Sequence, residues 1–429
     1  MARASGLTRI NDHGPGHPLA WIVWSVPAFF FLYEYLLRIM PGIIEKDLEQ
    51  EFGIDEAAMG GSLSMYYFAY APMQLAVGVL LDRFGARILL TGAAVICVIG
   101  LVVFSMSTTP FGLSGSRFLI GFGSSFAFIG ALYVAMVWFP EKRIPLLTGL
   151  TAGLGFGIGI VGELFAADAL GSPPAWRSAS LVLAGIGMLV AIGVLFVVPH
   201  RPAWYLDRTQ LDEGRSLGRA VRGLLEVIAR PSTWCISLGC ALMYLPLPLA
   251  ANWGPRTIGE LFGADTLDSS RLFAWFYLGV AVGCPISGWL SSRIGGARPI
   301  LLFGSLSICA ITIAIAVLPA IPPTAVAVLL LVWGIATSTY VLGYPLAARL
   351  SPADAQGSAI AFVNFVAMII AFGVVWLFGI AIDAFASSRS ADATPQREDF
   401  QSTLLWTGIL MGLAVVLIAA SRSRTAKAG

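Results

Sequence analysis

Charge is scarce in this sequence. Lys, Arg, Asp and Glu together make up 12% of its 429 residues, about half of what an average soluble domain carries. Apolar residues make up 57%, which is more than a single soluble core can bury. The formal net charge is only +2, too small to indicate a nucleic-acid partner. The composition therefore predicts an integral membrane protein.

Histidine and paired cysteine are also scarce. The three histidines, His13, His17 and His200, all lie outside the apolar stretches. We interpret the five cysteines as small apolar residues, because they are scattered and form no close pair of the metal-binding kind. The sequence has no Walker-type phosphate-binding loop and no clustered His, Ser or metal-ligand constellation. It therefore predicts no enzyme, no catalytic residue, no cofactor and no metal site.

Long apolar runs are abundant instead. A spanning helix needs about 20 mostly apolar residues. Twelve runs meet that length, with approximate limits 19–41, 57–81, 88–107, 111–139, 145–169, 177–199, 232–256, 271–292, 298–319, 323–349, 357–383 and 403–420. The first run is too long for a cleavable signal peptide and has no small-residue cleavage site. We expect an all-α polytopic membrane protein with 12 transmembrane helices.

The positions of Lys and Arg predict the orientation. With the N-terminus inside, cationic residues are about three times as frequent in the inner segments as in the outer ones, the positive-inside pattern. Both termini are therefore expected on the cytoplasmic side, with the chain in a bacterial inner membrane.

The second and third runs are joined by a short cationic connection that contains Gly78, Asp82, Arg83, Gly85 and Arg87. Glycines suit a tight turn, and the arginines mark a cytoplasmic loop. The pattern resembles the loop signature of the major facilitator superfamily, which joins helices 2 and 3. The resemblance implies that these five residues take part in switching between inward-open and outward-open states. An ordinary topogenic loop, which needs only the positive charges, is the alternative interpretation.

The same pattern recurs after the eighth run. Residues 288–295 match residues 78–85 at an offset of 210, with Ser292 in place of the aspartate. Between the copies lies the longest inner linker, in which one helical face carries Leu217, Val221, Leu224, Leu225 and Ile228. We expect this amphipathic helix to lie on the membrane surface. The resemblance implies two related six-helix halves, residues 1–199 and 232–429, joined by the linker 200–231.

Charge inside the runs is confined to Glu34 and Arg38 in the first, Arg117 in the fourth and Glu163 in the fifth. At about 1.5 Å per residue, Glu34, Arg117 and Glu163 lie toward the outer half of the membrane. An unpaired charge costs about 2.5–3.5 kcal/mol at mid-helix, so these groups must face a cavity or each other. Structural ion pairing is the alternative interpretation, and Glu163 is equally compatible with packing near the membrane surface.

Polar and aromatic side chains surround this layer. Tyrosine has an apolar body and a polar tip, which suits a partly wet cavity. The expected substrate and coupling site adds to the charged residues a set of six: Tyr66, Tyr70, Tyr244, Asn252, Tyr340 and Asn364. Each of these alone is also compatible with a contact between helices.

Three further stretches add to the resemblance. Arg117 followed by Gly121 is similar to the helix 4 signature of the family, and the Glu34–Arg38 pair is loosely similar to the organic-anion and sugar-phosphate permease branch. The fifth run lacks the Gly-Pro pair of many drug antiporters.

The leading hypothesis is a secondary active transporter that moves a small anionic or zwitterionic organic solute by alternating access. Proton symport is favoured because Glu34 and Glu163 are protonatable. Glu34 is the first candidate for the proton carrier, and Glu163 or Asp383 is the alternative. A proton-coupled exporter is the second choice, and a non-transporting membrane sensor is the rival class. The expected partners are the solute, protons and lipid, and the chain is expected to be a monomer that binds no nucleic acid.

Overall fold

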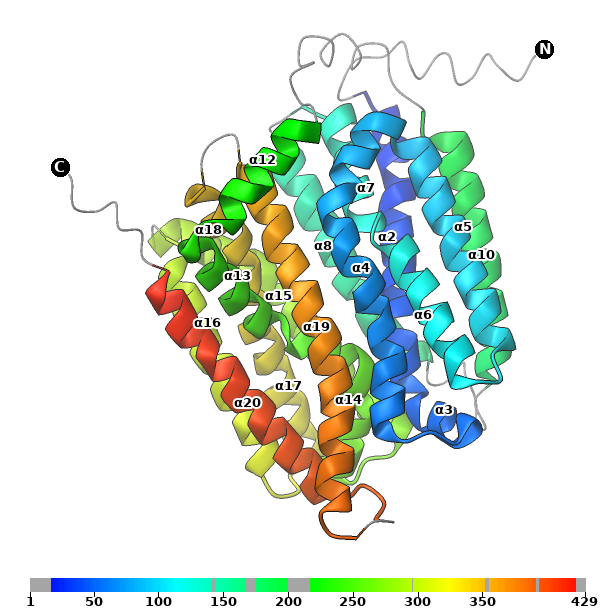
Figure 1. The fold of residues 1–429 in the computed structure, drawn as a ribbon, viewed down its shortest axis with the longest axis vertical. Coiled ribbons are helices and arrows are strands. Elements are labelled where there is room, and N and C mark those ends of the chain that lie inside the picture. Colours follow the sequence, from blue (N-terminus) through cyan, green and yellow to red (C-terminus); the bar gives the residue numbers. More distant parts are fainter. Residues whose placement is uncertain are drawn as a thin grey trace, which may run out of the picture.

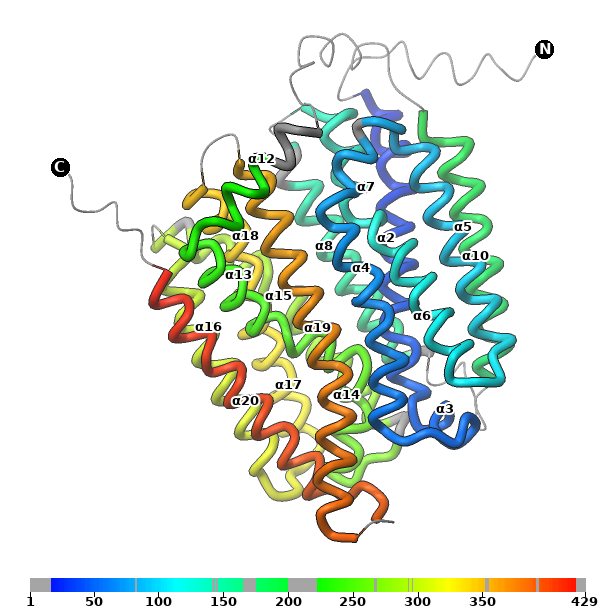
Figure 2. Tube along the Cα trace, viewed as in Figure 1, coloured from blue at the N-terminus to red at the C-terminus, as the bar shows by residue number. Residues whose placement is uncertain are grey.

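The computed structural model describes residues 17–140, 143–166, 175–199, 217–294, 296–351, 355–390 and 393–421. All regular elements in these ranges are helices, and twelve spans are long and apolar enough to cross a membrane. The spans form one bundle, and the chain colours show that the early spans occupy one side of it and the late spans the other (Figures 1 and 2). The predicted all-α architecture with 12 spans is confirmed.

We call the first six spans the first set. They are α2 (Leu19–Ile43), α4 (Glu56–Phe84), α5 (Ala86–Met106), α6 (Pro110–Ser124) with α7 (Ala127–Trp138), α8 (Ile144–Val161) with the π-helix η2 (Gly162–Ala166), and α10 (Trp176–Val197). The short helix α3 (Glu45–Phe52) connects the first two spans. The helix α12 (Leu217–Ile228) follows the sixth span.

We call the last six spans the second set. They are α13 (Pro231–Tyr244) with α14 (Pro246–Phe262), α15 (Thr266–Ile294), α16 (Arg298–Val317), α17 (Pro323–Ser338) with the 3-10 helix η3 (Thr339–Leu342) and α18 (Gly343–Arg349), α19 (Gln356–Ser387), and α20 (Arg397–Ala420).

The largest differences between the predicted and the observed span limits are at two charged ends. The last span begins at Arg397 rather than 403, because Gln396 and Asp399 form a capping box that stabilises a charged first turn. The seventh span continues past Arg256 to Phe262 and ends at Gly263, whose φ of 73° closes the helix. Arg256 did not end the helix because it is buried in ion pairs.

Three spans are interrupted inside the bundle. The fourth breaks between α6 and α7, the seventh between α13 and α14, and the tenth at η3. At the seventh span the cause is visible in the sequence, because Pro246 and Pro248 remove backbone donors. Broken helices free backbone groups and place side chains off the regular helical path, and they are common beside binding sites.

Three main pairings join the two sets: α4 with α19, α8 with α15, and α2 with α14. The sequence repeat relates the second span to the eighth and the fifth to the eleventh. The first two pairings are therefore equivalent, as two related halves predict. Glycines allow the backbones to meet closely: a Cβ on Gly42 would lie 2.3 Å from the Ala251 oxygen, and one on Gly379 would lie 2.1 Å from the Glu56 oxygen.

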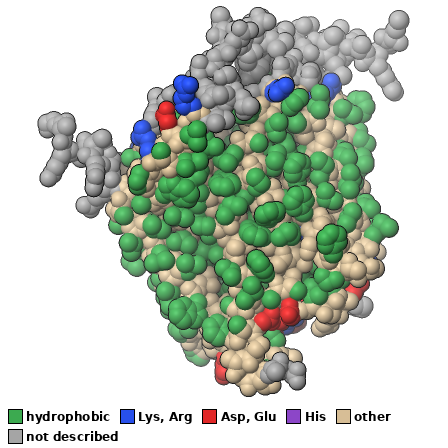
Figure 3. Space-filling view, viewed as in Figure 1, with side chains coloured by type: hydrophobic (Ala, Val, Ile, Leu, Met, Phe, Trp, Pro, Cys, Tyr) green, Lys and Arg blue, Asp and Glu red, His purple; other side chains and the backbone are tan. Residues whose placement is uncertain are grey.

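The two ends of the bundle differ in charge. We call them the α12 end, where α2 begins and α20 ends, and the α3 end (Figure 1). Figure 3 shows a hydrophobic belt between them, with Lys and Arg side chains near the α12 end and Asp and Glu side chains near the α3 end of this face. A bundle that spans a bilayer has this distribution, with an apolar belt between two charged ends.

The helix α12 covers part of the predicted linker. It packs against α19 through buried Gly223 and Val227, and Val227 was not on the predicted apolar face. Leu225 and Ile228 of that face are 61% and 37% exposed. Their exposure is compatible with contact to a membrane surface, whereas residues 200–216 of the linker and the side chains of 217–221 lie outside the described residues.

Candidate functional site

Glu34 and Arg38 form an ion pair on α2. Arg38 Nη2 lies 3.2 and 3.3 Å from the two carboxylate oxygens of Glu34. Arg38 Nε donates to Tyr66 Oη at 3.0 Å, and Tyr66 Oη donates to Glu34 Oε2 at 2.8 Å. The three side chains close a triangle of buried polar groups. Because the two charges balance and both have hydrogen-bond partners, the pair can lie inside the membrane.

Aromatic rings surround the Arg38 guanidinium. Its Cζ atom lies 5.1, 5.2 and 5.3 Å from the ring centroids of Tyr35, Tyr66 and Tyr70, within cation–π range. Glu34 has no exposed side-chain surface, whereas 9% of the Arg38 side chain is exposed. Arg38 is therefore the accessible member of the ion pair.

Arg117 reaches the same place from α6 but contacts backbone. Its Nη1 donates to the Leu37 oxygen at 2.9 Å and its Nη2 to the Arg38 oxygen at 3.5 Å. The guanidinium Cζ lies 5.0 Å from the Tyr66 ring centroid. Arg117 is completely buried, and its Nε has no partner among the described residues. These contacts fix the part of α2 that carries Arg38.

Tyr244 and Tyr340 approach from the second set. Their ring centroids are 5.2 Å apart, and Tyr244 lies close enough to Arg38 to interact with its charge. Tyr244 is the last residue of α13 and Tyr340 lies in η3, so two of the helix interruptions place aromatic side chains at this site. Only 5% of Tyr244 and 9% of Tyr340 is exposed, so the two sets are closely packed here.

Asn252 and Asn364 form hydrogen bonds between the two sets. Asn252 Nδ2 donates to Tyr67 Oη at 3.1 Å. Asn364 Nδ2 donates to Gln74 Oε1 at 2.6 Å, and Tyr344 Oη donates to Asn364 Oδ1 at 3.2 Å. Both predicted asparagines therefore lie where the first and second sets meet, and both contacts must change if the sets move apart.

Glu163 is buried in η2 without a hydrogen-bond partner for either oxygen among the described residues. The π-helix packs against α15, where the Ser270 hydroxyl is a nearby potential hydrogen-bond donor to the carboxylate and Tyr277 is close enough to interact with its charge. The hydroxyls of Ser270 and Tyr277 likewise have no hydrogen-bond partner in the described part of the chain. An isolated carboxylate is costly to bury, so this position favours a bound proton or another cation.

Gly85 makes the whole turn between α4 and α5. Its φ is 77°, a conformation that favours glycine, and α5 begins at the next residue. Arg83 is exposed and Arg87 is half-buried at this end of α4. Gly78 has no atom within 4 Å of the position that a Cβ would take, so packing does not require a glycine there. The side chain of Asp82 lies outside the described residues.

A second charged cluster lies at the α3 end, and the sequence analysis missed it. Arg256 Nη1 lies 2.6 Å from an oxygen of Glu45 and 2.6 Å from one of Glu49, and Nη2 lies 2.5 Å from Glu56. Asp383 joins through Glu56 and accepts a backbone hydrogen bond at 2.6 Å. The three glutamates belong to α3 and α4, whereas Arg256 and Asp383 belong to the second set. We call these five residues the Arg256 cluster.

No group of three or more His, Cys, Asp or Glu side chains suited to a metal ion occurs in the part of the chain that the structure describes. The described cysteines are all free thiols. The side chains around Arg38 therefore offer ion pairing, hydrogen bonding and aromatic contact.

Comparison with known proteins identifies the family. Residues 23–375 match the family model described as Major Facilitator Superfamily. The probable nitrate/nitrite antiporter NarK1 of Thermus thermophilus is 24% identical over 65% of this chain and 62% of its own length. A putative tartrate transporter of Agrobacterium vitis is 24% identical over 56% of this chain and 60% of its own length. The match thus spans about three-fifths of the length of these two relatives.

The fold has solved counterparts. A bacterial homologue of the human lysosomal transporter Spinster, in an inward-facing and unoccupied conformation, superposes with a TM-score of 0.78. The two chains are 15% identical, and the superposition covers 96% of this chain and 100% of the other. The family model matches most of the length of this chain, and the chain has the same fold as a solved transporter. This chain therefore belongs to the Major Facilitator Superfamily.

Proposed function

We propose that this protein is a secondary active transporter that carries a small anionic or zwitterionic organic solute by alternating access, in symport with protons. The observation that carries the proposal is Arg38: a guanidinium between the two sets of helices, enclosed by tyrosines, with part of its side chain accessible. A planar guanidinium binds a carboxylate through two parallel hydrogen bonds. An anionic solute would take over the contacts that Glu34 now makes.

The relatives support an anionic solute. Two of them are described as transporters of nitrate or nitrite and of tartrate. A site with one accessible arginine and several tyrosines suits such solutes, because tyrosine hydroxyls can donate to the oxygens that the guanidinium leaves free. Organic acids, amino acids, short peptides and siderophores remain the solute classes to be tested.

The orientation that we propose places the α12 end in the cytoplasm of a bacterial cell, with the chain acting as a monomer. The arginines that flank the turn at Gly85 support it, because cationic loops are retained inside. In this orientation the Arg256 cluster faces outward. The loop residues Gly78, Asp82, Arg83, Gly85 and Arg87 would then guide the rearrangement of the inner ends.

Two glutamates compete for the role of proton carrier. Glu34 already has Arg38 and Tyr66 as partners, so losing its charge would leave a guanidinium unbalanced. Glu163 has no charged partner in the described part of the chain and lies where α15 of the second set packs against it. Its surroundings change whenever the two sets separate, which is what coupling requires. We therefore place the transported proton on Glu163. Glu34 stays charged and is the group that an anionic solute displaces from Arg38.

The experiment starts from a thermal-shift screen of the purified protein against organic acids, amino acids, dipeptides and siderophores. The solute that stabilises the protein most is then followed into liposomes, with an inward proton gradient imposed or collapsed. We expect accumulation above the external concentration only with the gradient. Solute that equilibrates but never accumulates would contradict proton coupling, and outward pumping would favour the exporter.

The carrier is assigned by comparing Glu163→Gln with Glu34→Gln. We expect Glu163→Gln to exchange solute across liposomes at close to the wild-type rate but to lose accumulation driven by the proton gradient. Glu34→Gln is expected to change solute affinity, because it frees Arg38. Glu51→Gln is the control, since Glu51 pairs with Arg177 within the first set. Proton-driven accumulation that survives in Glu163→Gln but not in Glu34→Gln would return the proton to Glu34.

A further inference from the structure

The Arg256 cluster has more negative than positive charge. Glu45, Glu49, Glu56 and Asp383 bring four carboxylates around one guanidinium. The neighbouring Lys46 is paired with Glu260 at 2.5 Å, so it is engaged elsewhere. The side chains of Arg256, Glu45, Glu49 and Glu56 are only 8, 1, 11 and 9% exposed. Like charges held together with so little water repel strongly, and the excess has to be neutralised.

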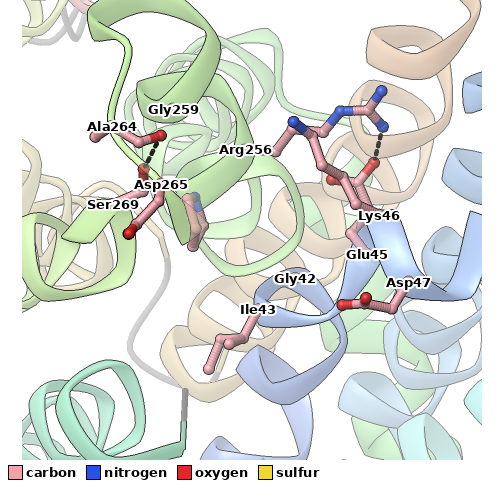
Figure 4. Close-up of a pocket in the computed structure, with 11 residues that line it drawn as sticks. Gly42, Ile43, Glu45, Lys46, Asp47, Arg256, Gly259, Ala264, Asp265 and Ser269 are labelled. Carbon is pink, nitrogen blue, oxygen red and sulfur yellow. Dashed lines mark hydrogen bonds and ion pairs between the residues drawn. The ribbon is translucent and has the colours of Figure 1, made fainter. Parts of the chain in front are cut away.

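The cluster also has unused hydrogen-bonding atoms. Glu45 Oε2 and Arg256 Nε are buried and have no partner among the described residues. A pocket of about 170 Å³ lies beside them, lined by Glu45, Lys46 and Asp47 on one side and by Arg256 and Asp265 on the other. Figure 4 shows Glu45 and Arg256 meeting at its edge across the junction of the two sets. Glu45, which carries the unpartnered oxygen, thus lines a pocket at the α3 end.

We propose that the Arg256 cluster is a proton-binding site of the α3-end gate, so that closing this gate takes up protons from the adjoining solution and opening it releases them. The inference rests on the alternating access proposed above. It concerns a site separate from Arg38 and Glu163, and it makes the gate responsive to the pH on its own side of the membrane.

Protonation of the cluster is linked to closure of the gate because its residues come from both sets of spans. Opening moves Glu45, Glu49 and Glu56 away from Arg256 and Asp383, because the two groups belong to different sets of spans. The exposed glutamates then regain water and bind protons as ordinary carboxyls do. Closing crowds them again. A proton that is bound in only one of two states shifts the equilibrium toward that state.

The pKa of Glu49, which lies outside the membrane spans, supports this direction. Burial and the neighbouring Glu45 raise its pKa from 4.5 to about 10 in the closed gate, against the attraction of Arg256. Burial likewise raises the pKa of Glu45. Since the pKa is higher in the closed state, closure is favoured most at pH below 4.5, and this preference is lost as the pH rises toward 10. Each proton exchanged changes the open-to-closed ratio by up to about tenfold per pH unit within that window.

The charged groups that face Glu49 come from every helix packed around it. Glu45 on α3, Glu56 at the start of α4 and Arg256 on α14 act on Glu49 directly. Asp383 on α19 and Asp55 join through Glu56, whereas Lys46 and Glu260 pair with each other and Asp47 lies beside them on α3. Of these, Arg256 alone holds the glutamates of α3 and α4 together through ion pairs that an open gate would lose.

The test measures gate opening without any solute. Spin labels are attached to Gln50→Cys on α3 and Asp268→Cys on α15, both exposed, in a protein whose five native cysteines are replaced by alanine. Distances between the labels are recorded in nanodiscs from pH 5.5 to 9.5 by double electron–electron resonance. We expect the population with the longer distance to grow as the pH rises. A distribution that stays the same over this range would overturn the proposal.

Variants assign the effect to the cluster. Glu49→Gln mimics a carboxyl that keeps its proton, so we expect its gate to stay closed over the whole pH range. Glu45→Gln, a second variant in case the first fails to fold, should shift the response in the same direction. Glu51→Gln is the matched control on α3 and should follow the wild type. A wild-type response retained in both Glu49→Gln and Glu45→Gln would exclude this site.

Failure of the transport proposal would look different. If the labels report opening with pH but no solute accumulates in liposomes, the gate site stands and the solute or the coupling is wrong. If solute accumulates normally while the label distances ignore pH, alternating access stands and the gate site is wrong.

Discussion

Two arginines in this protein bind carboxylates in opposite ways. Arg38 pairs with Glu34 one turn away on the same helix, so the charges balance and move together. Arg256 binds glutamates that lie about 200 residues away, at sequence separations of 211, 207 and 200, and these belong to the other set of spans. The first pair persists through any rigid movement of the two sets, whereas the second grouping must break when they separate.

The difference shows what each grouping can do. A balanced pair within one helix can stay in the membrane throughout a transport cycle and offer its arginine to a solute. An unbalanced group across a moving boundary stores a conformational preference, and its excess charge ties that preference to protons. The residue types are the same in both groupings. In the roles that we propose, solute binding for Arg38 and gating for Arg256, the difference comes from which helices carry the residues.

The largest expected effect comes from removing Arg256. Arg256→Gln leaves three glutamates and Asp383 without their guanidinium, and breaking a buried ion pair from one side costs about 3–5 kcal/mol. We expect the melting temperature to fall and the label distance at the α3 end to lengthen at neutral pH. Lys46→Gln is the control, because its pair with Glu260 is partly exposed and worth at most about 1 kcal/mol.

Equal melting temperatures and label distances in Arg256→Gln and Lys46→Gln would show that the cluster holds nothing together. Arg256 would then differ from Arg38 only in where it lies, and not in whether it holds the two sets of spans together. A drop in stability with an unchanged distance would also count against gating, since it would make the cluster a fixed structural contact.

Packing offers a smaller change that alters no charge. A Cβ at Gly42 would lie 2.3 Å from the Ala251 oxygen across the boundary between the sets, whereas one at Gly121 would lie 2.1 Å from the Tyr66 oxygen within the first set. Overpacking of this kind costs about 1–3 kcal/mol. We expect both alanine variants to be less stable. Only Gly42→Ala should also shift the label distance toward the open gate.

Gly121→Ala serves as the internal control, because its clash is present in both open and closed states. If it opened the gate as much as Gly42→Ala did, the boundary between the sets would not be the place where the molecule moves. The division at the linker 200–231 would then need revision.

Much of this architecture could be predicted from the sequence. Apolar length is enough to find twelve spans, and the i, i+4 spacing of Glu34 and Arg38 is enough to place them on one face of a helix. The turn at Gly85 can also be predicted locally, because a tight turn needs a positive φ and glycine adopts one without steric cost. Features that depend on one helix and its immediate neighbours in sequence are readable in this way.

Contacts between distant helices could not be predicted. Tyr35 and Tyr277 face each other with ring centroids 6.2 Å apart, but nothing in their local sequence indicates a partner. Arg256 and its glutamates read as ordinary charges outside or at the ends of apolar runs. Only the packing of α14 against α2 and α3 shows that they are buried together. Depth along a helix is likewise a poor guide to contact, because Arg117 and Glu163 were expected in one charged layer but contact backbone and uncharged side chains instead.

Arg117 allows the finest test of the comparison, because it supports Arg38 without being part of the ion pair. Its two hydrogen bonds to the Leu37 and Arg38 oxygens hold the turn of α2 that presents the Arg38 guanidinium. Lysine keeps the charge but cannot reach two carbonyls in a fixed fork. Arg117→Lys should therefore lose about 1.5–3 kcal/mol of solute binding, the range expected for one hydrogen bond made by a charged group. Arg38→Lys should lose more, since it alters the group that touches the solute.

The measurement is the dissociation constant of the screened solute, set beside the melting temperature of each variant without solute. Gate distances at the α3 end should stay unchanged in Arg117→Lys, because α6 does not contribute to the Arg256 cluster. Wild-type affinity in Arg117→Lys would show that Arg38 is positioned by Tyr66 and Glu34 alone, and a shift in the gate would mean that the two arginine sites are coupled through α2.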